Sequence, residues 1–257
     1  MKFTRAIVRP PGANFADGLT TVDLGVPDYA LTLRQHAAYC EALERCGLTL
    51  IRLEPDLRFP DSTFVEDTAV LAEGCAVVTR PGDPTRLGEE VEIRAELAKS
   101  FAVVDAIHAP RTVDGGDICE AGPHFFLGVS KRTNTEGARQ LATILERRGF
   151  SAETVDVREV PGILHLKSGV SYLGDGRLVV IPGLAAHPAF ARYERVVVDE
   201  EEAYAANCVR VNDAVVVPAA HPRTSAAIRA LGYPVIELAM SEFQKMDGGL
   251  SCLSLRF

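Results

Sequence analysis

Apolar strand-like segments and amphipathic helical segments alternate along the chain in a recurring order. Each recurrence has a strand, a tight turn, a second strand, a helix and a third strand. In the clearest copy, the strand Thr63–Leu71 turns at residues 72–74 into the strand Ala76–Thr79, and a helix over Glu89–Lys99 precedes the strand Phe101–Ile107. Short apolar runs bounded by turn residues predict the strands, and a longer segment with helical periodicity predicts the helix.

Three further copies follow with dissimilar sequence but the same order. The second begins near Thr112, the third near Ile163 and the fourth near Ala205. The second copy is predicted to have a turn at Glu120–Pro123, the strand Phe125–Val129, the helix Thr135–Arg148 and the strand Ala152–Val157. The third is predicted to have a turn at 174–176, the strand Leu178–Ile181, a short helix around Ala185–Tyr193 and the strand Arg195–Val198. The fourth is predicted to have a turn at 212–213, the helix Pro222–Leu231 and the strand Val235–Leu238.

A fifth copy is split between the two ends of the chain. Its first strand is predicted at Leu250–Phe257, and the N-terminal part supplies the strand Arg5–Val8, the helix Asp28–Cys46 and the strand Leu48–Leu53. Pairing of the C-terminal strand with the N-terminal elements would close a ring and remove free sheet edges. The period of about 40–50 residues is typical of a propeller or a solenoid.

The predicted fold is therefore α/β: a five-bladed αβ-propeller of pseudo-five-fold ββαβ repeats, with residues 1–257 in a single domain. An open doubly wound α/β sheet is the alternative, since it also alternates strands and helices. The hairpin before each helix argues against that alternative, because a plain βα alternation has none. In a five-fold ring the equivalent first strands surround one axis, so residues far apart in sequence meet at its centre.

Composition and charge restrict the class of protein. Of the 257 residues, 47% are hydrophobic and 24% are charged, as in an ordinary globular protein. No run approaches the roughly 20 apolar residues of a membrane span, and the N-terminus has no apolar signal-peptide core, so we expect a cytoplasmic protein. A formal net charge of -8 argues against a nucleic-acid partner and suits a small cationic substrate.

The six cysteines are scattered without a CxxC pair, so typical zinc spacing is absent and a disulfide framework is not expected. Cys252 differs from the others because it follows Gly248-Gly249 near the C-terminus, where the backbone can turn sharply or approach a ligand closely. Free cysteine is often buried, so a core position is the alternative interpretation of this residue.

Unusual polar residues fall at the first strand of four units. The first unit carries Glu66 and Asp67, the second Asp114, the third His165 and the fifth Cys252. Cysteine, histidine and a carboxylate are the components of an activated thiol. Each alone also fits a structural role, such as a packed histidine or a turn aspartate. Glu66 and Asp67 point to opposite faces if they lie in one strand, and a buried carboxylate needs a partner.

At these positions the chain resembles the dimethylarginine dimethylaminohydrolases, a family of the guanidine-modifying (pentein) superfamily. The resemblance covers nearly the whole chain and rests on the motifs Pro60-Asp61, Phe64-Val65-Glu66-Asp67, Thr79-Arg80-Pro81-Gly82, Asp114-Gly115-Gly116-Asp117, the segment from Gly128 to Asn134, His165-Leu166-Lys167-Ser168, Ala206-Asn207-Cys208 and the segment from Ser241 to Cys252. It implies a five-bladed αβ-propeller, in agreement with the repeat. It also implies one catalytic domain that hydrolyses Nω-methylated arginine to citrulline and methylamine or dimethylamine, without a metal or other cofactor.

The resemblance implies a role for each residue at the axis. Cys252 would attack the guanidinium carbon of the substrate. His165 would protonate the departing amine and then activate water against the thiouronium intermediate, while Asp114 orients the histidine. Asp67 matches the carboxylate that holds the guanidinium nitrogens, with Glu66 and Asp61 around the substrate. Some members of the family have glutamate where this chain has Asp114, and the carboxylate chemistry is the same.

A second group of residues matches the substrate-binding positions of the family. Arg86 and Arg132 correspond to the pair that receives the α-carboxylate of the substrate, a role suited to bidentate arginine. Leu19 and Met246 fall near positions whose backbone contacts the substrate. The expected partner is therefore a small cationic guanidino amino acid, bound by a monomer or a homodimer.

Other functions remain as alternatives. The enzyme could hydrolyse or deiminate another guanidino compound such as arginine, since the N-methyl pocket leaves no clear sequence mark. A non-catalytic propeller acting as a binding module is a second class, although it would not be expected to keep cysteine, histidine and acid together. A cysteine peptidase is poorly supported, because anionic residues around the thiol suit a guanidinium better than a neutral amide. The ionisation of the resting thiol is left open, since carboxylates raise its pKa and His165 could lower it.

Overall fold

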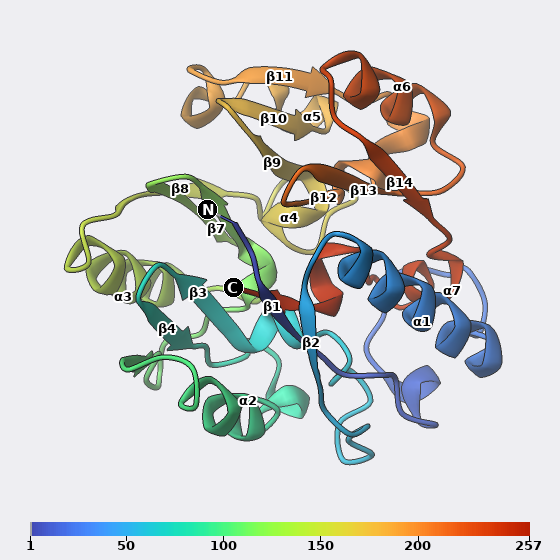
Figure 1. Cartoon of the computed structure of the whole chain (residues 1–257). Helices are drawn as coiled ribbons and strands as arrows, with labels where there is room; N and C mark the ends of the chain where they lie inside the picture. The colour runs from blue at the N-terminus through green and yellow to red at the C-terminus, as the bar shows by residue number, and fades with distance from the viewer. Residues whose placement is uncertain (1) are drawn as a thin grey trace.

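Five three-stranded sheets surround a common centre in the computed structural model, which describes residues 2–257 (Figure 1). In each sheet the first strand along the repeat is antiparallel to the second, and the second, central strand is parallel to the third. The sheets comprise β3 (Ala69–Ala72), β4 (Cys75–Val78) and β5 (Val104–Ala106); β6 (Ile118–Ala121), β7 (His124–Val129) and β8 (Ser151–Asp156); β9 (Val170–Gly174), β10 (Arg177–Val180) and β11 (Glu194–Val197); β12 (Val209–Val211), β13 (Ala214–Pro218) and β14 (Val235–Leu238); β15 (Leu255–Arg256), β1 (Arg5–Val8) and β2 (Thr49–Arg52).

The fifth sheet combines the two ends of the chain, as predicted. In β15, Leu255 and Arg256 pair with Ile7 and Ala6 of β1, and the carbonyl oxygen of Phe257 accepts from the amides of Thr4 and Arg5 at 2.8 Å. The C-terminal strand therefore supplies the strand that the N-terminal unit lacks. The repeat order ββαβ and the five-bladed αβ-propeller are confirmed, and the doubly wound alternative is excluded.

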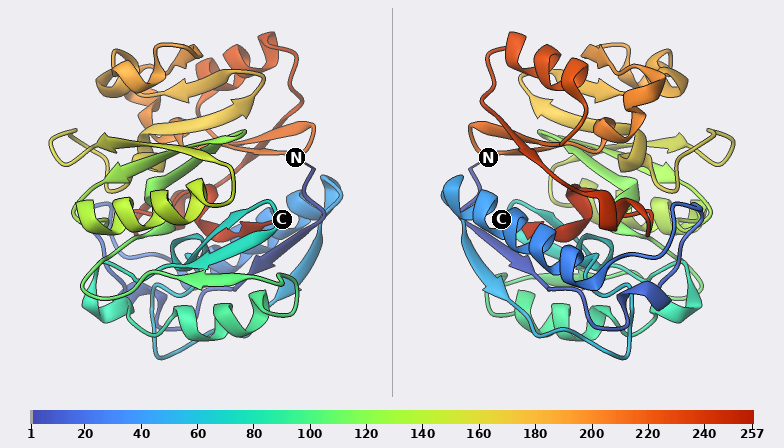
Figure 2. Two further views of the ribbon diagram at one scale, coloured as in Figure 1. Left: turned by 90° about the vertical axis from the view of Figure 1, so that its left-hand side faces the viewer. Right: turned by 90° about the vertical axis from the view of Figure 1, so that its right-hand side faces the viewer.

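Longer helices connect the second and third strands of the blades and lie at the periphery (Figures 1 and 2). They are α1 (Tyr29–Arg45), α2 (Glu90–Leu97), α3 (Thr135–Glu146) and α6 (Pro222–Ala230). Side-chain caps fix two of their starts: Asp28 accepts from the Leu31 amide at 2.8 Å, and Asn134 accepts from the Gly137 amide at 2.7 Å. No helix in residues 2–257 combines the length and apolarity needed to cross a membrane.

The third blade departs from the predicted helix at Ala185–Tyr193. The connection there forms two short pieces, α5 (Pro182–Ala185) and the 3₁₀ turn η5 (Pro188–Phe190). Each piece has proline near its start, and proline lacks the N–H needed to continue a helix from the preceding turn. The sequence predicted the position of this connection but not its division.

Short helical turns replace part of two predicted first strands. Within Thr63–Leu71, residues Val65–Thr68 form the 3₁₀ turn η2, and within Leu250–Phe257, residues Ser251–Leu253 form the 3₁₀ turn η7. Comparable turns precede the first strands of two other blades, η4 (Gly115–Asp117) and α4 (Leu166–Gly169). Glu66, Asp67 and Cys252 therefore lie on helical turns at the centre rather than on extended strands.

Tight apolar packing surrounds these central turns. Phe15 of the 3₁₀ turn η1 (Phe15–Asp17), Phe64 and Phe243 of α7 (Ser241–Gln244) meet edge to face, with ring centroids 5.6 to 6.3 Å apart. A Cβ on Gly248 would lie 2.3 Å from a ring carbon of Phe64. Glycine at this position lets the chain before Cys252 lie against the aromatic cluster.

Candidate active site

The central turns bring residues from four blades to one small cavity. The turns η2, η4, α4 and η7 contact one another in pairs. Eight of the predicted site residues line the cavity, namely Leu19, Asp61, Asp67, Arg86, Arg132, His165, Met246 and Cys252. Asp114 lies behind His165 and contacts it directly, whereas Glu66 lines a different cavity. The propeller geometry thus gathers residues that are more than 200 positions apart in sequence.

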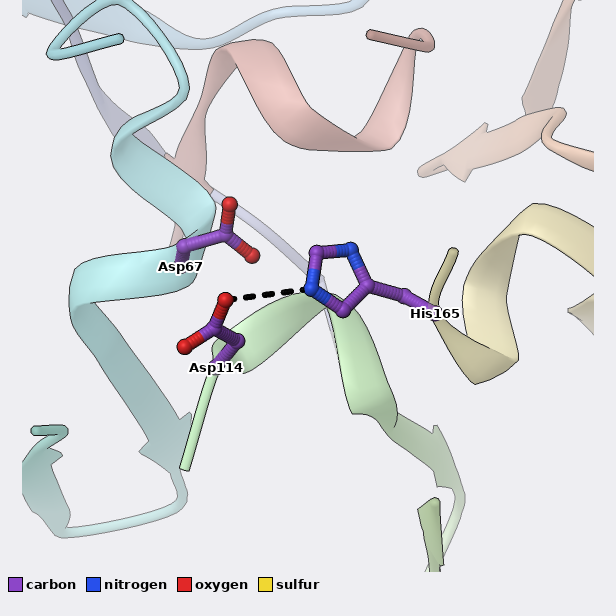
Figure 3. Close-up of side chains that lie close together, drawn as sticks. All are labelled: Asp67, Asp114 and His165. Carbon is purple, nitrogen blue, oxygen red and sulfur yellow. Dashed lines mark hydrogen bonds and ion pairs between the residues drawn. The ribbon is translucent and has the colours of Figure 1, made fainter. Parts of the chain in front are cut away.

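Asp114 and Asp67 both point toward the imidazole of His165 (Figure 3). Asp114 Oδ2 lies 3.1 Å from His165 Nε2, and its Oδ1 accepts from the Gly82 amide at 2.8 Å. Asp67 Oδ1 accepts from the Gly116 amide at 2.8 Å. A Cβ on Gly116 would lie 2.8 Å from both Asp67 Oδ1 and His165 Nδ1, so this glycine is needed for the close approach of the three groups.

Surrounding carboxylates keep the imidazole of His165 protonated. Burial alone would lower its pKa, but Asp67, Asp117 and Asp114 raise it to about 9. Burial would likewise raise the pKa of Asp67, and the charges of His165 and Arg86 lower it to about 2. At neutral pH the site therefore contains an imidazolium next to the ionised carboxylate of Asp67.

A metal ion could in principle be held by three of these residues, because one ligand atom each from Asp67, Asp114 and His165 lies within 4.8 Å of the others. A metal needs the neutral imidazole, and a histidine with a pKa of about 9 is protonated at neutral pH. Its Nε2 is already paired with Asp114, and Asp67 is paired with Arg86 at 2.6 Å. The donor set fits an ion-paired network better than a metal site.

Cys252 lies on η7 at the opposite side of the same cavity, partly buried. Burial raises the pKa of its thiol, and the carboxylates of Glu66 and Asp67 raise it further, to about 12. The Gly249 amide donates to Sγ at 3.4 Å, and this hydrogen bond lowers the pKa of the thiol. The resting thiol is therefore protonated at neutral pH, which answers the question that the sequence left open.

We expect this ionisation to govern alkylation of the free protein. The rate of Cys252 modification by iodoacetamide should still be rising at about pH 9.5, because the thiolate is the nucleophile and its fraction grows with pH until the pKa is passed. Mass spectrometry of the Cys252 peptide measures the rate, with the partly buried Cys46 as an internal comparison. A plateau reached near pH 7 would contradict a protonated resting thiol.

Arg86 is buried and already bound within the site. Its Nε and Nη2 donate to the two carboxylate oxygens of Glu89 at 3.0 and 2.8 Å, and its Nη1 donates to Asp67 Oδ2 at 2.6 Å. Burial would lower its pKa, but Glu89 and Asp67 raise it well above the usual value, so that it stays charged. Arg86 keeps one Nη1 hydrogen for a substrate and does not offer a free bidentate fork.

Arg132 is less constrained. Its Nη1 lies 3.6 Å from Asp83 Oδ2, and its side chain is 13% exposed. The Ser130 hydroxyl accepts from the Arg132 amide at 2.9 Å and donates to buried Asp117 at 2.7 Å, which fixes the loop. Of the two predicted carboxylate-binding arginines, Arg132 has more of its donors free.

Asp61 and Leu19 are linked at the edge of the cavity. The Leu19 amide donates to both carboxylate oxygens of Asp61 at 3.2 Å. Burial raises the pKa of Asp61, and Arg86 and Arg132 oppose that rise. The Leu19 amide is thus used within the protein, and its carbonyl oxygen is the backbone group left for the contact that the resemblance predicts. Met246 is buried against the cavity on the C-terminal side.

The side chain of Glu66 faces away from this cavity. Its Oε1 lies 2.6 Å from Lys167 Nζ and 3.1 Å from Arg256 Nη2, in a second cavity on the other side of the central turns. The opposite orientations of Glu66 and Asp67 agree with the sequence argument, although a 3₁₀ turn produces them. A substrate contact from the Glu66 carboxylate, as the resemblance implied, is not supported by this placement.

Two residues of the site were missed by the sequence reasoning. Glu89 pairs with Arg86 three positions earlier, a spacing at which helical side chains meet. Asn207 belongs to a quoted motif but had no role assigned; it hydrogen-bonds to α4 and η7. The three-residue spacing was a local signal for the pairing of Glu89 with Arg86, whereas the role of Asn207 could not be found without knowing which turns lie together.

Comparison with known proteins finds relatives that match over nearly the whole length of the chain. The chain is 47% identical over 257 residues to the N(G),N(G)-dimethylarginine dimethylaminohydrolase of Pseudomonas aeruginosa, covering 99% of this chain and 100% of that protein. It is 34% identical over 258 residues to the protein of that name from Streptomyces coelicolor, covering 100% and 98%. No protein-family model matches.

Solved structures agree with the sequence matches. A Cys-to-Ser variant of the Pseudomonas aeruginosa enzyme complexed with citrulline superposes with a TM-score of 0.97 at 45% identity, with full coverage of both chains. The N-terminal domain of the arginine dihydrolase ArgZ, at 19% identity and a TM-score of 0.88, shares the fold.

The propeller and its central cysteine, histidine and carboxylates define a hydrolase of the guanidine-modifying αβ-propeller class. Within that class, the family is shown by the sequence identity of 47% and 34% to the two relatives over nearly the full length of the chain. It belongs to the dimethylarginine dimethylaminohydrolase family.

Proposed function

We propose that the protein hydrolyses Nω-methylated arginine, either asymmetric dimethylarginine or monomethylarginine, to L-citrulline and dimethylamine or methylamine. One observation carries the proposal: a thiol, a protonated imidazole and a carboxylate that already pairs with a guanidinium line one cavity. Asp67 holds the guanidinium of Arg86, and its oxygens have further lone pairs for the guanidinium of a substrate.

The first half-reaction forms a bond between Cys252 Sγ and the guanidinium carbon. The arriving cation offsets the negative potential of Glu66 and Asp67 that keeps the thiol protonated, so Cys252 releases its proton to solvent as the substrate binds and attacks as the thiolate. The bond from this carbon to the methylated nitrogen then breaks. The imidazolium of His165 gives its proton to the departing amine and becomes neutral, leaving an S-alkylthiouronium on Cys252.

The second half-reaction restores the enzyme. Neutral His165 takes one proton from water as the water oxygen attacks the thiouronium carbon. The bond from this carbon to Cys252 Sγ then breaks, and the second proton of that water passes to the departing sulfur, which restores the thiol as the carbonyl group of citrulline forms. Asp114, through Nε2, holds the ring so that Nδ1 is free to exchange protons with the substrate and with water. The products are citrulline and the amine, and Arg132, with one N–H of Arg86, receives the α-carboxylate throughout.

A substrate comparison tests the proposal. We expect citrulline to be released from asymmetric dimethylarginine and monomethylarginine and much more slowly from arginine, measured by colorimetric or mass-spectrometric detection of citrulline under the same conditions. Turnover of arginine alone would instead assign an arginine hydrolase, and turnover of none of the three would refute the proposed class of substrate. A cytoplasmic location and a monomeric or homodimeric state stay as predictions.

A further inference from the structure

Asn207 uses its whole side-chain amide to join the two turns that carry the cysteine and the histidine. It ends the 3₁₀ segment η6 (Glu200–Ala206) and is 5% exposed. Its Nδ2 donates to the carbonyl oxygen of Lys167 on α4 at 2.9 Å and to the Ser251 hydroxyl on η7 at 3.1 Å. Its Oδ1 accepts from the Ser251 amide at 3.0 Å.

These contacts end next to the reacting groups. Lys167 is two residues after His165, and Ser251 is directly before Cys252. Three blades meet at this one amide, because η6, α4 and η7 precede the first strands of three different sheets. A shift of Asn207 would therefore change the position of the thiol relative to the imidazole, although Asn207 is not among the residues that line the substrate cavity.

The chain before the nucleophile is shaped to admit this side chain. A Cβ on Gly249 would lie 2.5 Å from Asn207 Cγ and Oδ1, a distance that no side chain could occupy without displacing the amide. Gly249 is also the residue whose amide donates to Cys252 Sγ at 3.4 Å. Gly249 thus packs against the amide of Asn207 and donates to the thiol of Cys252.

On the opposite side of the turns, the connection is ionic and made by long side chains. Glu66 on η2 pairs with Lys167 and Arg256, and Arg256 Nη1 donates to the Ser251 carbonyl oxygen at 3.3 Å. Long side chains have many rotamers, whereas the planar amide of Asn207 makes three bonds with two torsions. Asn207 is the stiffer of the two connections between α4 and η7.

We propose that Asn207 is a positioning residue that sets the geometry of Cys252 relative to His165. The inference rests on the proposed function, because its activity test measures citrulline release. It adds to that function a residue that does not itself contact the reacting atoms. A reacting atom misplaced by about 1 Å can cost on the order of 10²-fold in rate. Loss of the amide is therefore expected to act on the chemical step rather than on substrate binding.

The test compares Asn207→Ala and Asn207→Asp with the wild type. We expect kcat for citrulline release to fall on the order of 10²-fold in Asn207→Ala with little change in KM. In Asn207→Asp the carboxylate would be buried against the Lys167 carbonyl oxygen, which raises its pKa; the protonated form, which restores one donor, is then more populated at about pH 6 than at about pH 9. The ratio of kcat between Asn207→Asp and wild type should then be higher at about pH 6 than at about pH 9, whereas the ratio for Asn207→Ala should stay flat.

Asn212 provides the matched control. Its amide also makes three hydrogen bonds, accepting from the Phe3 amide and donating to the carbonyl oxygens of Phe3 and Cys46, in the turn between β12 and β13. Asn212→Asp loses the same two donors and adds the same charge. It is expected to lower thermal stability without lowering kcat. Equal losses of kcat in the two aspartate variants, or an unchanged kcat in Asn207→Ala, would overturn the positioning role.

Alkylation separates this inference from the proposed function. If the wild type releases no citrulline, the function fails, and Asn207 is then judged by iodoacetamide modification of Cys252 at about pH 9. We expect slower modification in both Asn207 variants, because the Gly249 amide is no longer held against Sγ, and no change in Asn212→Asp. Unchanged modification in the Asn207 variants would overturn the inference. If Asn207→Ala does not fold, the pH dependence of Asn207→Asp decides.

Discussion

Replacement of Cys252 by serine is expected to lower citrulline release by on the order of 10⁴-fold or more, the largest effect of any single substitution in this chain. Removal of a covalent nucleophile in other hydrolases has effects of this order or larger. Serine keeps the size of the side chain, but its hydroxyl is a far weaker nucleophile than a thiolate. The substrate cavity, with Asp67 and Arg132, is left intact, so binding should persist.

Cys46→Ser is the control for this substitution. Cys46 is the other partly buried cysteine, lies at the C-terminal end of α1 and is not among the residues that line the cavity of Cys252. We expect unchanged kcat in this variant. Acid quenching during turnover, followed by mass spectrometry, should detect a covalent adduct on Cys252 in the wild type and none in Cys252→Ser. Residual activity above a few per cent in Cys252→Ser would assign the nucleophile elsewhere.

The architecture could be predicted from sequence because each blade carries its own local signal. The hairpin turns at 174–176 and 212–213 separate β9 from β10 and β12 from β13, where Asp175 and Asn212 adopt positive φ. Such turns are marked by glycine, aspartate and asparagine and are readable without tertiary information. The split fifth blade followed from counting strands, and the pairing of β15 with β1 confirms it.

The central turns could not be predicted in the same way. The segments around Glu66 and Cys252 are apolar and short, and such runs favour a strand when considered alone. Partners from other blades decide their conformation: Asn207 accepts from the Ser251 amide, and Gly115 packs so closely that a Cβ would lie 2.0 Å from the Glu66 carbonyl oxygen. Tertiary contacts thus override local propensity where the site is formed.

Individual site residues were predictable to different degrees for the same reason. The meeting of Asp67, Asp114 and His165 follows from the five-fold repeat, because equivalent positions surround one axis. The burial of Arg86 between Asp67 and Glu89 does not follow from the repeat, because it depends on the path of the loop after β4. The orientation of Glu66 toward Lys167 depends likewise on the helical turn η2.

Replacement of His165 by glutamine is expected to lower kcat by on the order of 10²- to 10⁴-fold, the range of general acid–base contributions. Glutamine can still hydrogen-bond to Asp114, but it cannot release a proton to the departing amine or take one from water. Citrulline release measures the loss. If the amine departs without the acid, the adduct on Cys252 should accumulate, since water activation is lost as well; a variant with wild-type kcat would refute the acid–base role.

The protonation state of His165 in the folded protein can be tested through the pH dependence of the free energy of unfolding. The pKa of His165 is about 9 in the folded protein and about 6.5 when unfolded, so the folded state binds the proton more tightly. The resulting stabilisation is fully present below about pH 6.5 and is lost as pH rises through about 9. Urea unfolding across this interval should show a fall in the free energy of unfolding of the wild type that is smaller in His165→Gln, because glutamine does not titrate. Parallel curves for the two proteins would mean that His165 is neutral in the folded state, and Asp67 and Asp114 would then need another counter-charge.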